Sequence, residues 1–300
     1  MIKHKLKEAT KDPAKIIIYL LRRIAKQWDD EFYLKVIYFL TFRKKLNLDN
    51  PQTFNEKLQW LKLYDRRPEY TIMVDKYAVR KYVAEKIGNE YLIPLLGVWN
   101  DPDDIDFDSL PNQFVLKCNH DSGGICICKD KSKINIEKVK ARLRKSLNHD
   151  YYKVAREWPY KNVPRRIIAE QYMEDESGYE LKDYKIFNFN GSPKLIEVDF
   201  DRFKSHKRNI YTIDWNFINL EIQYPSDSNK IIERPKQLDK ILTLCQKLSE
   251  GIPHIRTDFY VINDKVYFGE LTLYHGSGTE KFKPKEWDYK LGQLLQLPDV

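Results

Sequence analysis

The sequence lacks an apolar segment long enough to cross a membrane. Near its N-terminus the longest apolar run, Ile16 to Leu21, has six residues and is followed at once by Arg22 and Arg23. A membrane span needs about 20 apolar residues, and a signal peptide needs a longer apolar stretch with a small-residue cleavage site. We expect neither, so the sequence predicts a cytoplasmic protein.

Cysteine is scarce, with four residues in 300. This number and the clustering of three of them do not fit the disulfide framework of a small secreted protein, so a reducing compartment is favoured. Cys118, His120, Cys126 and Cys128 could offer zinc ligands, but their spacing is not that of a common zinc finger. We interpret the cysteines as small buried strand residues.

The sequence also lacks the P-loop consensus GxxxxGK[ST], and its six histidines suggest no Ser-His-Asp or Cys-His nucleophile. The net charge of +8 is uneven, because residues 1–48 hold 12 Lys/Arg against 5 Asp/Glu and the remainder holds 40 against 39. This distribution predicts a neutral catalytic body with a cationic extension, and no nucleic-acid partner.

The cationic extension, residues 1–48, is predicted to form two helices. Asp12-Pro13 has the form of an N-cap with proline at the first helical position, and apolar residues recur at helical spacing as far as Trp28. Phe32 to Phe42 predicts a second helix. The two helices are expected to pack on the body. The alternative is peripheral attachment to the cytoplasmic face of an anionic membrane through their basic amphipathic surface.

The sequence of the body, after residue 48, predicts a mixed α+β fold. Thr53 and Glu56 form a capping-box pattern at the start of a helix, and Asn190-Gly191 and Asn263-Asp264 are hairpin signals. Further helices are predicted over 76–87, with Gly88 as a left-handed cap, from about Asn135, and over 236–250. Strands are predicted at 93–99, 114–119, 125–128, 167–171, 184–190, 193–200, 257–262 and 265–273.

Two strand ends carry candidate nucleotide-binding residues. Lys117 lies near the end of a strand that runs into a loop with Gly123 and Gly124, where a lysine and backbone N–H groups can contact phosphate. The alternative is a surface lysine before an ordinary turn. Glu170 ends another apolar strand that could line an adenine pocket, or could be a core strand with an exposed end.

A predicted hairpin carries two carboxylates, Asp258 and Glu270. Paired strands lie about 5 Å apart, so the two side chains can approach each other across the sheet. Carboxylates at that separation repel unless a cation lies between them, and Mg²⁺ is commonly held by one or two carboxylates together with substrate phosphates. A solvated salt-bridge pair is the alternative interpretation.

In combination and order, these segments resemble the ATP-grasp superfamily, and more closely the TupA-like ATP-grasp family of bacterial teichuronopeptide and capsule biosynthesis. The resemblance begins near Arg43 and covers most of the remaining chain. The similar stretches are NPQTFNEKLQWLKLYD, DKYAVRKYV, FVLKCNHDSGG, AEQYM, DYKIFNFNG and RTDFYVINDKVYFGELTLYHGSG. The resemblance implies an ATP-grasp fold with two α+β subdomains that grip ATP. It divides the chain into an extension (1–48), an N-terminal α/β region (49–111) and a catalytic domain (112–300).

The resemblance also implies roles for individual residues. The family pattern makes Lys76 and Lys117 phosphate ligands and places Gly123 and Gly124 in the loop over ATP. Lys185 matches the following strand and is expected to contact phosphate, and Lys185 and Arg256 are the residues expected to act in the reaction. Asp258 and Glu270 match the magnesium carboxylates, but Thr272 stands where the superfamily commonly has asparagine. The acceptor substrate is expected beside Arg256 and the 274–278 loop. The residues that would hold the adenosine are Glu170, Tyr172 and Met173.

The implied reaction is an ATP-dependent ligation with ATP and Mg²⁺ as cofactors. A carboxylate, expected to be a sugar or glycan uronic acid, would form an acyl phosphate that an amino acid or other amine converts to an amide. The alternatives are a kinase that uses the same nucleotide site and a glycosyltransferase that uses a nucleotide sugar. The sequence does not predict the oligomeric state.

Overall fold

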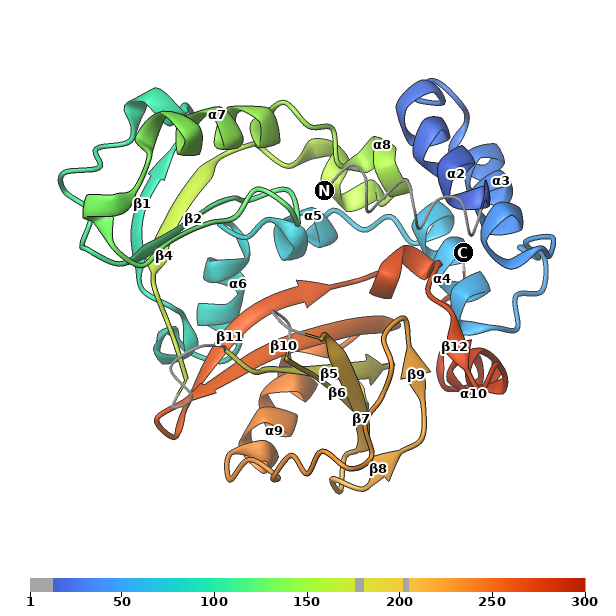
Figure 1. Ribbon diagram of the computed structural model, residues 1–300. Helices are drawn as coiled ribbons and strands as arrows, with labels where there is room; N and C mark the ends of the chain where they lie inside the picture. Colours follow the sequence, from blue (N-terminus) through green and yellow to red (C-terminus); the bar gives the residue numbers. More distant parts are fainter. Residues whose placement is uncertain (1–12, 176–180, 202–204, 300) are drawn as a thin grey trace.

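The computed structural model describes residues 13–175, 181–201 and 205–299, and these residues form two main antiparallel sheets of four and six strands and a third sheet of two strands (Figure 1). The smaller sheet has the strand order β1-β4-β2-β3 and the larger has the order β11-β10-β5-β6-β7-β8. Helices accompany both sheets, so the predicted α+β class is confirmed. The strands of the smaller sheet are β1 (Leu95–Trp99), β2 (Phe114–Cys118), β3 (Cys126–Cys128) and β4 (Ile167–Gln171).

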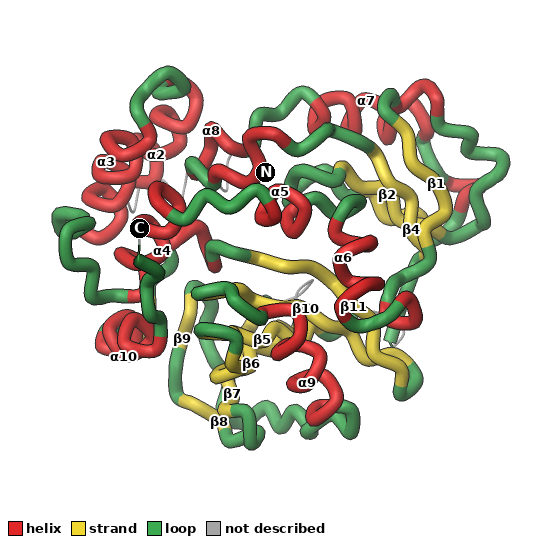
Figure 2. The backbone as a smooth tube through the Cα atoms, turned by 180° about the vertical axis from the view of Figure 1, so that it is seen from behind, coloured by secondary structure: helices red, strands yellow, loops and turns green. Residues whose placement is uncertain are grey.

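The larger sheet forms the centre of the molecule. Helix α9 (Leu238–Ser249) contacts its strands β5, β6 and β10, and the two views place this helix on the face away from the smaller sheet (Figures 1 and 2). A strand pair, β9 (Glu221–Ile222) and β12 (Phe282–Lys283), lies beyond the sheet. The strands of the larger sheet are β5 (Asp183–Phe189), β6 (Ser192–Phe200), β7 (Lys207–Thr212), β8 (Phe217–Ile218), β10 (His254–Ile262) and β11 (Lys265–Thr272).

Hairpins join neighbouring strands where the sequence predicts them. Asn190 and Gly191 connect β5 to β6 with φ of 49° and 77°, and Asn263 and Asp264 connect β10 to β11 with φ of 49° and 61°. Positive φ at both central residues is typical of the type I′ turn, whose twist matches that of the strands. Both predicted hairpins are confirmed.

The N-terminal helices α2 (Pro13–Ile24) and α3 (Asp30–Phe42) pack around a small apolar core of their own. They lie on the opposite side of the molecule from the smaller sheet (Figure 1). The predicted cap Asp12 lies outside the described residues, and Trp28, which the helical spacing included, lies beyond the end of α2. No helix in the described part of the chain is long and apolar enough to cross a membrane.

Helix α4 (Phe54–Tyr64) begins as predicted with a capping box, in which Thr53 and Glu56 each hydrogen-bond the other's backbone N–H. The helix predicted over 76–87 is shorter, because α6 covers Val79–Lys86. The Gly88 prediction was wrong: its φ of 120° is not left-handed helical. The remaining helices are α5 (Glu69–Val74), α7 (Ile136–Leu147), α8 (Tyr152–Ala155) and α10 (Glu286–Leu294), with single 3₁₀ turns at η1 (Asn89–Tyr91), η2 (Pro102–Asp104), η3 (Lys131–Lys133), η4 (Trp158–Asn162) and η5 (His275–Gly278).

Candidate active site

A cavity of about 630 Å³ is lined by residues of both sheets and of the α5–α6 segment. The smaller sheet contributes Val115 and Lys117 from β2 and Glu170 from β4, while the larger sheet contributes Gly269 and Glu270 from β11. The volume lies within the range of about 300–1,000 Å³ that ligand pockets occupy. Segments far apart in sequence therefore converge on one ligand-sized space.

Lys117 and Glu170 face the cavity as an ion pair. Lys117 Nζ lies 2.6 Å from Glu170 Oε2, and Arg80 Nη1 lies 3.3 Å from the other carboxylate oxygen. The pairing of β2 with β4 places these side chains on neighbouring strands. Sequence reasoning missed Arg80. Its position four residues after Lys76, on the same segment, was the available signal.

Lys76 is held at the rim of the glycine-containing loop. Its Nζ donates to the Asp121 carbonyl at 2.6 Å, and its backbone N–H donates to the Asn119 carbonyl at 3.0 Å. Burial lowers the pKa of Lys76. The lysine therefore lies in the cavity lining, connected to the loop that follows β2.

The two loop glycines have different surroundings. Gly123 is exposed, with no atom within 4 Å of where a Cβ would lie, whereas a Cβ on Gly124 would collide with the Ser146 hydroxyl. The Gly124 N–H donates to Asp121 Oδ1 at 3.2 Å. Gly124 thus fits a close approach between this loop and α7, and its expected phosphate contact remains a prediction.

The predicted adenosine residues lie together. Glu170, Tyr172 and Met173 all line the cavity, next to the apolar side chains of Ile125 and Ile127. An apolar cavity with a few polar groups suits a flat purine base.

Asp258 and Glu270 were expected to approach each other across the sheet, and in the structure they are direct cross-strand partners. The next pair along is Phe259 with Phe268, so Gly269 is the extra residue of a β-bulge. A Cβ on Gly269 would lie 3.0 Å from the Asp258 carbonyl oxygen, which is why glycine suits this bulge.

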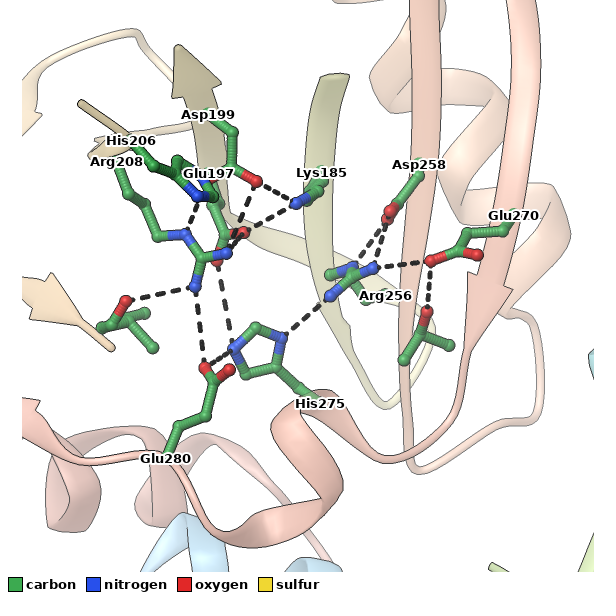
Figure 3. Close-up of polar contacts among 12 residues, drawn as sticks. Lys185, Glu197, Asp199, His206, Arg208, Arg256, Asp258, Glu270, His275 and Glu280 are labelled. Atoms are coloured by element: carbon green, nitrogen blue, oxygen red, sulfur yellow. Dashed lines mark hydrogen bonds and ion pairs between the residues drawn. The ribbon is translucent and has the colours of Figure 1, made fainter. Parts of the chain in front are cut away.

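Arg256 lies between the two carboxylates (Figure 3). Its Nε and Nη2 each lie 2.7 Å from an oxygen of Asp258, and Nη2 is also 2.9 Å from Glu270 Oε1. Burial, together with the neighbouring Glu270 carboxylate, raises the pKa of Asp258 to about 7 even though Arg256 opposes the rise. Burial acts in the same direction on Glu270, but Arg256 and Lys76 hold the pKa of this carboxyl below its ordinary value.

Lys185 and Thr272 flank this group. Lys185 pairs with Asp258 in the strand register, but its amine forms ion pairs with Glu197 and Asp199 and lies outside the lining of the cavity. The Thr272 hydroxyl donates to Glu270 Oε1 at 3.3 Å. The structure therefore brings Thr272 to the carboxylates, while the amine of Lys185 is paired with Glu197 and Asp199.

A buried ionic network continues from Arg256 away from the cavity (Figure 3). Arg256 Nη1 lies 3.1 Å from His275 Nδ1, and His275 Nε2 lies 2.8 Å from Glu280 Oε2. A guanidinium can only donate, so Nδ1 is assigned as the acceptor and Nε2 as the protonated nitrogen. Glu280 also approaches Arg208 at 3.6 Å. Sequence reasoning named Arg256 and the 274–278 loop but missed Glu280 and Arg208, because no local pattern links them to this site.

The donor set at the carboxylate pair consists of oxygen atoms, the ligand type that Mg²⁺ prefers. Asp258 and Glu270 present hard oxygen ligands with a cationic nitrogen already between them, and Thr272 adds a hydroxyl. The four cysteines are free and buried, and burial raises the pKa of the Cys118 thiol to about 11. In the described ranges no group of three or more His, Cys, Asp or Glu side chains could hold a metal ion.

Two antiparallel sheets flank a cavity that is lined by Lys117 and Glu170 on one side and by Glu270 on the other, an arrangement that suits an ATP-grasp enzyme. The family model described as TupA-like ATPgrasp matches residues 56–296. The chain therefore belongs to the TupA-like ATP-grasp family.

Solved structures show similarity at low identity. The chain is 16% identical to the D-alanine–D-alanine ligase of Bacillus anthracis complexed with ATP, over 67% of this chain and 54% of that one, with a TM-score of 0.39. The D-alanine–D-alanine ligase of Helicobacter pylori is 16% identical to the chain, over 81% of this chain and 69% of that one, with a TM-score of 0.42. An ATP-grasp RimK domain protein of Sphaerobacter thermophilus is 9% identical, over 75% of this chain and 69% of that one, with a TM-score of 0.42. No curated protein matches the sequence.

Proposed function

We propose that this protein is an ATP-dependent carboxylate–amine ligase that joins a sugar or glycan uronic acid to an amino acid or other amine in bacterial surface polysaccharide biosynthesis. The observation that carries the proposal is the two-sided cavity, with Lys76, Lys117 and Glu170 on one side and Glu270 beside Arg256 on the other. The biosynthetic context and the uronic acid come from the resemblance to the family.

The cavity suits MgATP. Lys76 and Lys117 supply positive charge for phosphate oxygens, and the apolar lining near Met173 suits the base. Asp258 and Glu270, with Thr272, would hold Mg²⁺, which when bound neutralises phosphate charge. Arg256 would then have to release at least one of its carboxylate contacts.

The chain's own residues would act by positioning and by charge. The substrate carboxylate attacks the γ-phosphorus, forming a C–O–P linkage as ADP leaves. The amine attacks the acyl carbon, phosphate leaves with one former carboxylate oxygen, and the amine loses a proton. Arg256, which can only donate hydrogen bonds, would stabilise the negative charge that develops on the acyl oxygen. Lys185 neighbours Asp258 and would contribute positive charge from behind the site.

A single assay separates this reaction from its rivals. Purified protein is incubated with MgATP, uronic acids and an amine mixture, and phosphate release and products are followed together by mass spectrometry. The ligase gives phosphate and an amide, and both require the amine. A phosphorylated product formed without amine identifies a kinase, and turnover of a nucleotide sugar without ATP use identifies a glycosyltransferase.

Peripheral association with the cytoplasmic membrane face is part of this proposal. Ile17, Leu20 and Ile24 of α2 are 46%, 49% and 73% exposed, and Arg22 and Arg23 lie among them on the surface. Exposed apolar side chains with interspersed cations suit the interface of a bilayer rich in phosphatidylglycerol.

Vesicle flotation tests the membrane association. The protein is expected to float with phosphatidylglycerol vesicles and not with phosphatidylcholine vesicles, and Arg22→Glu with Arg23→Glu should abolish flotation. Equal flotation of the double variant would show that these two arginines do not mediate binding.

A further inference from the structure

Helix α4 carries three polar side chains on a face that is fully buried. Asn55, Gln59 and Lys62 are each 1% exposed, and their spacing of four and three residues places them on one side of the helix. We call these three residues the polar stripe. The proposed reaction uses none of them. Buried polar groups are costly unless they are hydrogen-bonded, so the partners of the polar stripe show what it holds.

All three residues donate to backbone carbonyls of the loop after β11. Gln59 Nε2 donates to Ser277 O at 3.0 Å and to Gly278 O at 2.7 Å. Lys62 Nζ donates to Ser277 O at 2.7 Å, and Asn55 Nδ2 donates to the Glu280 carbonyl at 3.0 Å. The polar stripe therefore holds the backbone of residues 277–280 from one side through hydrogen bonds to its carbonyls.

The loop that the polar stripe holds, residues 275–280, has an unusual backbone conformation. Gly276, Ser277 and Gly278 have consecutive positive φ values of 52°, 54° and 62°. The left-handed region is unfavourable for a residue with a Cβ, so Ser277 needs support from its surroundings. That support includes the buried Glu157, which accepts a hydrogen bond from the Ser277 hydroxyl.

The loop also lies directly against α4. A Cβ on Gly278 would come within 2.5 Å of Gln59 Nε2 and 3.1 Å of Leu58 Cβ. Only a glycine allows this approach, and the approach brings the Gly278 carbonyl within reach of the polar stripe.

The loop contacts Arg256, which in turn contacts the carboxylate pair Asp258 and Glu270. His275 at its start contacts Arg256 through Nδ1 and Glu280 through Nε2, and Glu280 is itself held at its carbonyl by Asn55. Arg256 in turn contacts Asp258 and Glu270. A continuous series of contacts therefore runs from the polar stripe to the carboxylate pair.

We infer that Asn55, Gln59 and Lys62 are positioning residues for the acid-binding side of the active site. They hold residues 275–280 in a conformation that aligns His275 and Arg256 for the substrate carboxylate. The proposed phosphate ligands Lys76 and Lys117 line the cavity elsewhere, outside this loop. This inference rests on the proposed function in one respect, the assignment of the loop to the acid substrate.

The chain offers a matched control on the same helix. Lys57 is also a lysine of α4 that donates to backbone carbonyls, at 2.9 Å to Gly292 O and 2.7 Å to Leu295 O, but these carbonyls belong to the end of α10 and the residue after it. Lys57→Met therefore removes the same kind of contact without touching the loop. The test variants are Gln59→Leu and Lys62→Met, and Ser277→Ala is a milder change that removes only the contact to Glu157.

The first measurement is hydrogen exchange by mass spectrometry on the full-length, ligand-free protein. Peptides covering residues 274–280 should exchange at least tenfold faster in Gln59→Leu, Lys62→Met and Ser277→Ala than in the wild type, while Lys57→Met leaves them unchanged. Equal exchange in the test variants and in Lys57→Met would overturn the inference. Should Lys62→Met fail to fold, Gln59→Leu and Ser277→Ala still decide it.

The second measurement is steady-state phosphate release with MgATP, an amino-acid mixture and D-glucuronate or D-galacturonate. In Gln59→Leu the KM for the uronic acid should rise at least tenfold, with the KM for ATP within twofold of the wild-type value. A parallel rise of both constants would show a general structural defect and overturn the positioning role. Should the wild type release no phosphate with either acid, the proposed substrate class fails, and the exchange experiment still decides whether the polar stripe orders the loop.

Discussion

The two sides of the cavity are built in different ways. On the side of the smaller sheet, Lys117, Glu170 and Arg80 form a short ion-paired group that lines the cavity directly. On the side of the larger sheet, charged residues form a continuous buried network from Glu270 through Arg256 and His275 to Glu280. The first arrangement leaves its charges free to exchange partners with a ligand. The second holds most of its charges in place before a ligand arrives, and only the contacts of Arg256 to Asp258 and Glu270 would change on Mg²⁺ binding.

This difference assigns separate tasks to the two sides. Groups whose partners can be replaced suit the binding of nucleotide, while preorganised charges suit a transition state in which charge develops at a defined place. Variants on the smaller-sheet side should therefore change ligand affinity. Variants on the larger-sheet side should change turnover or the free energy of unfolding.

The largest effect is expected for Glu270→Gln. Loss of the carboxylate should cost about 4 kcal/mol of transition-state stabilisation, equivalent to about a thousandfold in ATP turnover. The measurement is phosphate release with MgATP, and circular dichroism should show an unchanged fold. Wild-type turnover in this variant would remove Glu270 from the reaction.

A smaller but clear effect is expected on stability for Glu197→Gln. Glu197 is fully buried with Lys185 and Arg208 within 3.2 Å and 3.0 Å, so the change leaves two buried cations with less compensation. We expect a loss of about 3 kcal/mol in the free energy of unfolding, measured by urea denaturation.

The matched control is Glu31→Gln, which removes an exposed ion pair with Lys35 and should leave the free energy of unfolding almost unchanged. Equal effects of the two changes would contradict the idea that the larger-sheet network is held by burial.

Lys117→Met and Lys185→Met compare two lysines, one on each side. Lys117→Met should weaken ATP binding about thirtyfold, or about 2 kcal/mol, because one charged phosphate contact is lost, with little change in stability. Lys185→Met should instead lower stability, because Glu197 and Asp199 lose a buried partner. Isothermal titration and urea denaturation measure the two effects, and similar profiles for both variants would remove the distinction between the sides.

The smallest effect concerns Lys62. Burial lowers the pKa of this lysine to about 8. The unfolded chain then binds more protons than the folded protein between this value and the ordinary lysine pKa of about 10.4, so the buried lysine penalises stability less as pH rises through that window. The free energy of unfolding of the wild type, relative to Lys62→Met, should rise by about 1.5 kcal/mol from pH 8 to pH 9.5. A flat difference would show that Lys62 is not desolvated as the structure places it.

Local patterns predicted the elements whose cause is local. The capping box at Thr53 and the turns at Asn190-Gly191 and Asn263-Asp264 depend on a few adjacent residues, and the structure confirms them. The turn at Asn263-Asp264 fixes the register of the strands next to it, but this register alone would pair Asp258 with Gly269. The bulge shifts the partner of Asp258 to Glu270.

The parts that could not be predicted depend on tertiary contacts. The bulge at Gly269 and the placement of Arg256 between two carboxylates arise from side-chain packing across strands. Strand β7 was not predicted, and its residue Arg208 joins a network with Glu197 and Glu280 that no sequence spacing indicates. The polar spacing of Asn55, Gln59 and Lys62 was visible, but polar residues on a helix are usually exposed.

The central claim is that ATP activates a carboxylate as an acyl phosphate before an amine captures it. The direct test uses a uronic acid labelled with ¹⁸O in its carboxylate, with MgATP and the amine mixture, and follows the mass of the released phosphate. The ligase reaction predicts one ¹⁸O in each phosphate and an amide that retains the other. Phosphate without label, or label retained entirely in a phosphorylated sugar, would contradict the account.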